Sequence, residues 1–155
     1  IIGKRKHTIS EFFYRTHHIQ QLGGYQIYPA GYYADDASIL LFCNNNGIAS
    51  TEESLIVYRK SENNISSSSC WNVEKSKAAL KYYQWIIDEF PMKQQDEQII
   101  QQRLDFDLYT YFSAALNIHQ SIQILNCIPV NIWNWKKKLL CLYKFILNSY
   151  AKQIK

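Results

Sequence analysis

Residues 32–43 have the sequence YYADDASILLFC, and this stretch decides the predicted fold. Two adjacent carboxylates, Asp35 and Asp36, lie between a short apolar stretch at residues 25–28 and a longer one at residues 37–43. Aspartate favours turns, and an apolar run bounded by turn residues is typical of a buried strand. The pattern predicts a β-hairpin over residues 25–43 with both aspartates at or beside its turn.

Adjacent carboxylates on a tight hairpin indicate a site for a divalent cation. Mg²⁺ prefers oxygen ligands, and two acids on one turn hold negative charge at a fixed point. Polymerases use such pairs to hold two metal ions, which stabilise the attacking and leaving oxygens of phosphoryl transfer. The alternative is an ordinary polar turn, because Asp-Asp is common in turns. Asp35 and Asp36 are therefore candidate catalytic residues and candidate Mg²⁺ ligands.

Upstream and downstream of the hairpin, the sequence predicts mainly helices. A basic, partly amphipathic segment at residues 4–22 ends at two glycines. Residues 50–53, STEE, form a capping box that should open a helix to about residue 62, before a loop rich in serine. Residues 74–90 have apolar side chains at helical spacing, although residues 70–73 could equally be a strand that leads into them.

The C-terminal half is predicted to be helical. One helix should begin at Asp96 and reach Phe112, with a continuation to Cys127 left open, and a last helix should start after Pro129. The last helix has one apolar stripe at a spacing of 3.6 residues, which predicts a face that packs on the core. The stripe consists of Ile132, Trp135, Leu139, Leu142, Phe145, Ile146, Tyr150 and Ile154.

The two signs of charge are segregated along the chain, whose formal net charge is +4. Residues 108–155 carry six lysines and no acid, and such a tail suits a polyanion such as nucleic acid. The alternative is a solvated, lysine-rich helix face. Acidic residues outside the hairpin, among them Asp105 and Asp107, are predicted to be helix caps and solvated faces. The candidate nucleic-acid-binding lysines are Lys136, Lys137, Lys138 and Lys144.

Length and composition favour one globular domain over residues 1–155. The chain has 155 residues, of which 47% are hydrophobic, enough for one core. The four cysteines form no CxxC pair and the four histidines lack helical metal-site spacing, so reduced thiols and no zinc site are expected. No run is long and apolar enough to span a membrane, and no secretion signal is visible, so an intracellular chain without a membrane partner is expected.

Two ordered motifs resemble the reverse transcriptases of non-LTR retrotransposons. Tyr33-Ala-Asp-Asp36 and the aliphatic run after it are similar to the YADD hairpin in the palm of that family. Asn72-Val-Glu-Lys75-Ser76-Lys77 is similar to the Asn-x-x-Lys-Ser/Thr-Lys stretch that follows the hairpin. The resemblance covers residues 25–80, with a serine run where the family has a turn glycine.

The resemblance implies an α+β fold, with a partial polymerase palm at residues 25–90 and a helical, thumb-like segment at residues 91–155. It implies an ancestral RNA-directed DNA polymerase that uses Mg²⁺ to add deoxynucleotides to a primer on an RNA template. The resemblance assigns Asp35 as metal ligand, Asp36 as its partner carboxylate, Tyr33 to the primer end and Lys75 to the departing pyrophosphate. The tract before Tyr32 is too short for the earlier palm motifs, so the chain should be inactive alone.

A different class of function competes with this interpretation. The chain could be a small helical module whose basic last helix docks on nucleic acid or on a partner protein, with YADD as an accidental turn. A membrane-surface helix is a weaker third alternative, because the apolar stripe of the last helix suits an ordinary core. A hairpin over residues 25–43 with both aspartates exposed would favour the polymerase.

Overall fold

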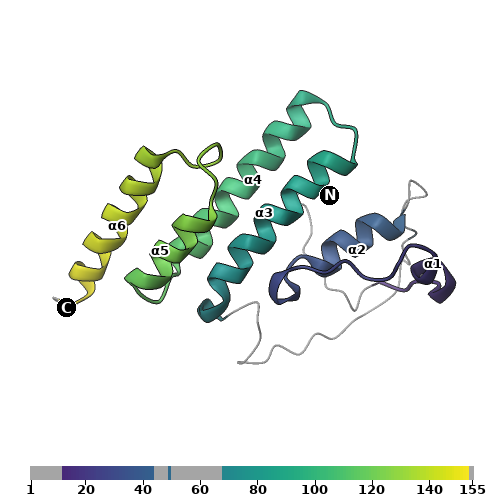
Figure 1. Cartoon of the computed structure of the whole chain (residues 1–155), viewed down its shortest axis with the longest axis horizontal. Helices are drawn as coiled ribbons and strands as arrows, with labels where there is room; N and C mark the ends of the chain where they lie inside the picture. Colours follow the sequence, from purple (N-terminus) through teal and green to yellow (C-terminus); the bar gives the residue numbers. More distant parts are fainter. Residues whose placement is uncertain (1–11, 44–48, 50–67, 154–155) are drawn as a thin grey trace.

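The computed structural model describes residues 12–43, 49 and 68–153, and no strand occurs among them (Figure 1). The predicted α+β fold with a palm hairpin is therefore wrong for this part of the chain. The helix predicted after Ser50 lies outside the described residues. The elements are α1 (Thr16–Gln21), η2 (Pro29–Gly31), α2 (Ala34–Cys43), η3 (Ser69–Trp71), α3 (Asn72–Glu89), α4 (Gln94–Ser113), α5 (Ile118–Cys127) and α6 (Trp135–Gln153).

The YADD stretch begins helix α2 instead of turning a hairpin. Asp35 and Asp36 occupy its first turn, where carboxylates interact favourably with the positive end of the helix dipole. The Ser38 hydroxyl donates to the carbonyl of Ala34 one turn earlier, at 2.6 Å. The helix buries Ala37, Ser38, Ile39 and Phe42, so the apolar run meets the rest of the chain as a helical face.

The segment predicted as the first strand, residues 25–28, is not part of a sheet. The backbone N–H of Gln26 donates to the Ser38 hydroxyl at 3.0 Å, and the carbonyl of Ile27 accepts from Lys81 on α3. The chain then reverses through η2 into α2. This reversal places Tyr33 in the left-handed region at φ 66°, a conformation that costs a non-glycine residue energy.

The helical interpretation of residues 74–90 is confirmed, and the alternative strand at residues 70–73 is not. η3 leads directly into α3, which ends just before Pro91, a residue that cannot continue a helix. The predicted helix from Asp96 to Phe112 is confirmed as α4, and the continuation to Cys127, which the sequence leaves open, is a separate helix, α5. The side chain of Asn117 caps α5 by accepting from the backbone N–H of Gln120 at 2.9 Å.

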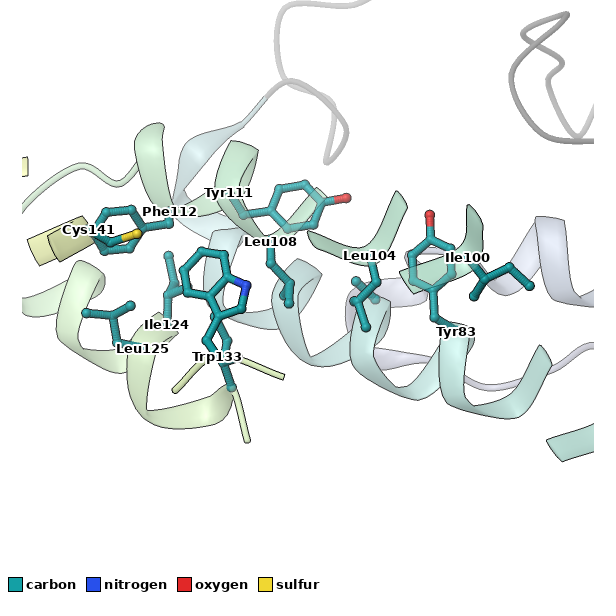
Figure 2. Packing of buried hydrophobic residues seen from close by; sticks show 12 residues of the cluster. Tyr83, Ile100, Leu104, Leu108, Tyr111, Phe112, Ile124, Leu125, Trp133 and Cys141 are labelled. Carbon is teal, nitrogen blue, oxygen red and sulfur yellow. The ribbon is translucent and has the colours of Figure 1, made fainter. Parts of the chain in front are cut away.

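The helices α3, α4, α5 and α6 form an array on one side of the molecule, and α2 lies on the other side of α3 (Figure 1). The main core lies within this array, where Trp133, Leu108 and Ile124 are fully buried. Figure 2 shows the Trp133 ring among side chains of α4 and α5. None of the described helices is both long and apolar enough to cross a membrane.

The predicted apolar stripe of α6 is divided between two faces. Leu142 and Phe145 pack against the core as predicted. Trp135, Leu139 and Ile146 are exposed, which contradicts their predicted place in the core. The core needs only one side of α6, because α5 is its principal neighbour.

Candidate functional site

Asp35 and Asp36 lie half-buried in the first turn of α2. Consecutive helical residues point about 100° apart around the axis, so the two carboxylates do not share the fixed focus that a hairpin turn would give them. Within the described ranges, no group of three or more His, Cys, Asp and Glu side chains could hold a metal ion. The helix therefore removes the hairpin geometry that motivated the predicted Mg²⁺ site.

The second motif, at the start of α3, is buried and joins two helices. The Asn72 amide donates to the carbonyls of Tyr111 and Ala114 at 3.0 and 3.1 Å. These carbonyls belong to the end of α4, where the helix itself supplies no donor. The Ser76 hydroxyl donates to the carbonyl of Asn72 at 2.8 Å. Asn72 therefore fixes the start of α3 against the end of α4, and Ser76 bonds back to Asn72 within α3.

Lys75 of the second motif lies close to Tyr32, the residue that precedes the first motif. Its ammonium donates to the carbonyl of Ser68 at 2.9 Å and lies 5.4 Å from the ring centroid of Tyr32. Burial lowers the pKa of Lys75, because the charged form loses hydration. The Tyr32 ring and the Ser68 carbonyl offset part of that loss. Lys75 thus lies beside the residue that precedes YADD.

Three tyrosines surround one buried carboxylate, and we name this group the tyrosine–aspartate cluster. The hydroxyls of Tyr33 and Tyr83 donate to Oδ2 of Asp107 at 2.9 and 2.6 Å. The hydroxyl of Tyr111 lies 2.8 Å from that of Tyr33, to which it donates because the Tyr33 proton faces the carboxylate. Arg103, one turn earlier on α4, completes the cluster with Nε 3.5 Å from Oδ1 of Asp107.

The electrostatics of the cluster keep its hydroxyls protonated. Burial, together with the Asp107 charge, raises the pKa of Tyr33 and of Tyr83 far above the ordinary tyrosine value, and burial does the same for Tyr111. The hydroxyls of Tyr33 and Tyr83 are both donated to the carboxylate, so the cluster fixes α2 to α3 and α4. The Tyr33 hydroxyl is thus engaged inside the protein. Its predicted contact with a primer stays a prediction.

Lys137 joins α6 to α4 instead of facing solvent freely. Its ammonium lies 2.5 Å from Oδ1 of Asp105 and 4.7 Å from the ring centroid of Trp133. The indole N–H of Trp133 donates to the same carboxylate oxygen. Asp105 therefore links a buried tryptophan and a lysine to α4.

Lys138 has an internal role at the end of α5. Its ammonium donates to the carbonyls of Leu125 and Ile128 at 2.7 and 2.5 Å. A cation there compensates the negative end of the helix dipole. Lys136 and Lys144, by contrast, are exposed, and Lys136 lies 5.7 Å from the ring centroid of Trp135. The structure thus divides the four candidate lysines into one pair that is engaged within the protein, Lys137 and Lys138, and one exposed pair, Lys136 and Lys144.

Sequence reasoning missed the roles of Asp105 and Asp107. The prediction of a cap or solvated face is wrong for Asp107, whereas Asp105 is partly exposed and has specific partners as well. Asp107 is buried, and Asp105 binds both Trp133 and Lys137. One signal was available for Asp107. It lies three residues after Leu104 and four before Tyr111, on the apolar face of α4, where a carboxylate needs partners.

No family model matches this chain, and no curated protein or solved structure is significantly similar to it.

Proposed function

We propose that this chain is a reverse-transcriptase-like segment that binds nucleic acid and carries out no nucleotidyl transfer by itself. The observation that carries the proposal is that the second motif lies beside the residue that precedes the first. Lys75 of the second motif lies against Tyr32, next to the YADD stretch, although the two are far apart in the sequence. A shared site for both motifs is what their resemblance to one polymerase family implies.

The lack of turnover follows from the carboxylates. Two-metal phosphoryl transfer needs oxygen ligands from separate segments and a pocket that aligns the triphosphate. Asp107 is occupied by two tyrosine hydroxyls and Arg103, and Asp105 by Trp133 and Lys137. Neither carboxylate is therefore placed to complete a metal site with the aspartates of α2.

Primer extension on an RNA template should give no product with Mg²⁺ or Mn²⁺. A ligand misplaced by about 1 Å can cost roughly 100-fold in rate, so a missing ligand should abolish turnover. The measurement is extension of a labelled primer by the purified chain over hours. Extension that depends on the template and is abolished by Asp35→Asn would contradict the proposed inactivity.

Binding to an RNA–DNA hybrid should weaken with salt in a way that depends on the exposed lysines. Each phosphate contact contributes about 0.9 to the slope of log affinity against log salt, so Lys136→Gln with Lys144→Gln should lower the slope by up to about 1.8. The measurement is fluorescence anisotropy of a labelled hybrid across a salt series.

The matched control for this experiment is Lys137→Gln with Lys138→Gln, which removes the same charge from the same helix. These ammonium groups are engaged with Asp105 and with the end of α5, so the slope should change by well under 1 unit per lysine. Equal changes of slope in the two double variants, each with its helical circular dichroism retained, would contradict the phosphate contacts of Lys136 and Lys144.

A helical binding module for a partner protein is a second candidate. The observation that favours it is the exposed apolar side of α6, which the core does not use. A contiguous exposed patch of this kind is typical of an interaction site.

A further inference from the structure

Helix α6 carries a largely apolar face that points away from the core. Its side chains are between 38% and 61% exposed. They recur at spacings of three and four residues and so lie along one side of the helix, over about 18 Å at roughly 1.5 Å per residue. We name this set the α6 outer face, and it consists of Trp135, Leu139, Leu140, Tyr143, Ile146 and Leu147.

The opposite side of α6 is already occupied. Cys141 is buried, and Leu142 and Phe145 pack against the core. Lys138 fixes the same side to the end of α5. Because α6 is the last helix of the array in Figure 1, its outer face is where a further helix would extend that array.

The charge around the outer face selects the chemistry of its partner. Lys136 lies within the face, Lys144 borders it, and both are exposed. Residues 108–155 contain no acidic side chain that could neutralise them. Packing against the α6 of a second copy would place lysines against lysines, and like charges across an interface are unfavourable. These two charges favour an acidic occupant of this face.

We infer that the α6 outer face docks an amphipathic helix of a partner protein whose apolar stripe is flanked by aspartate or glutamate. A straight apolar stripe of about three turns matches the side of another helix, which can pack its ridges into the grooves of α6. The two exposed lysines lie eight residues apart, about 12 Å along the helix, and would pair with acidic side chains of the partner. This inference deepens the second candidate function, because it names the partner chemistry of the same α6 face, and it does not depend on the reverse-transcriptase-like proposal.

Two synthetic peptides test this inference with the full chain. Both are 21-residue helices held by a lactam bridge, with leucine along one stripe, and they differ in having glutamate or lysine on the flanks. Measured by anisotropy of a fluorescent label, the glutamate peptide should bind at least tenfold more tightly than the lysine peptide. Reversing the charges with Lys136→Glu and Lys144→Glu should reverse this preference.

The apolar contribution is tested separately. Leu139→Ser with Leu147→Ser should weaken binding of the glutamate peptide at least tenfold, because the centre of the stripe is lost. Phe106→Ser, which changes an equally exposed apolar side chain on α4, is the matched control and should leave binding unchanged. Circular dichroism checks that each variant keeps its helices.

Other occupants are distinguished with three further probes. The inference is overturned if the glutamate peptide does not bind, or if its binding survives the double serine variant. Phosphatidylserine vesicles or a single-stranded oligonucleotide could bind in place of the peptide. If either binds and loses affinity in the double serine variant while the glutamate peptide does not bind, the inference is overturned and the face belongs to that ligand. A dimer seen by sedimentation that the double serine variant dissociates would assign the face to a second copy instead.

Discussion

Replacing Asp107 by alanine should lower the free energy of unfolding by about 3 kcal/mol. The change removes the acceptor of two tyrosine hydroxyls, and hydrogen bonds to a charged group contribute roughly 1.5–3 kcal/mol each, less the cost of burying the carboxylate. It also leaves the Tyr83 hydroxyl without its carboxylate acceptor in a buried position. Urea unfolding monitored by circular dichroism measures the effect.

Two milder variants show that the effect comes from the cluster. Asp107→Asn keeps an oxygen acceptor but loses the charge, so it should cost about half as much as alanine. Tyr33→Phe removes one hydroxyl from the cluster and should cost about 1 kcal/mol. Surface substitutions usually change the free energy of unfolding by no more than about 0.5 kcal/mol. A change that small for Asp107→Ala would mean that the carboxylate is solvated and that the cluster does not exist.

Trp133→Ala should destabilise the chain by about 4 kcal/mol. The indole is 0% exposed, and its removal leaves a cavity in the core beside Phe112. The loss also leaves the Asp105 carboxylate without its indole donor. The same unfolding measurement reports the change, and Trp133→Phe, which fills most of the space, should cost less.

Trp135→Ala is the matched control for this prediction. Trp135 is the same residue type only two positions later, but it is 61% exposed on the α6 outer face. Its removal should change the free energy of unfolding by no more than about 0.5 kcal/mol, as is usual on a surface. Similar losses from both tryptophan variants would mean that the core assignment of Trp133 is wrong.

The helices that the sequence predicted correctly are those with long apolar periods and clear ends. Residues 74–90 have such a period and stop before Pro91, and the helix after Pro129 has one as well. Residues 37–43 could not be assigned in this way, because a short apolar run has no period that separates a strand from a helix. The favourable place of Asp35 and Asp36 at a helix start was equally compatible with the sequence.

The candidate site was less predictable than the fold. The composition indicated a basic tail, but charge counting cannot tell that Lys137 and Lys138 are committed to Asp105 and to α5 carbonyls. The partners of Asp107 come from three different helices or their ends, and only the tertiary structure brings them together. The apolar stripe of α6 was visible, although which half of it the core would cover depends on where α5 lies.

The tyrosine–aspartate cluster joins residues that are far apart in the sequence, and this separation predicts the order in which the helices form their contacts. Tyr33 is 74 residues from Asp107 and 78 from Tyr111, whereas α4, α5 and α6 each follow the preceding helix after a short connection. Short loops close at a lower entropic cost than long ones, so contacts between successive helices should form first. The α3 to α6 array should therefore assemble before α2 docks. The contact of the Tyr33 hydroxyl should form late, so its loss should speed unfolding far more than it slows refolding.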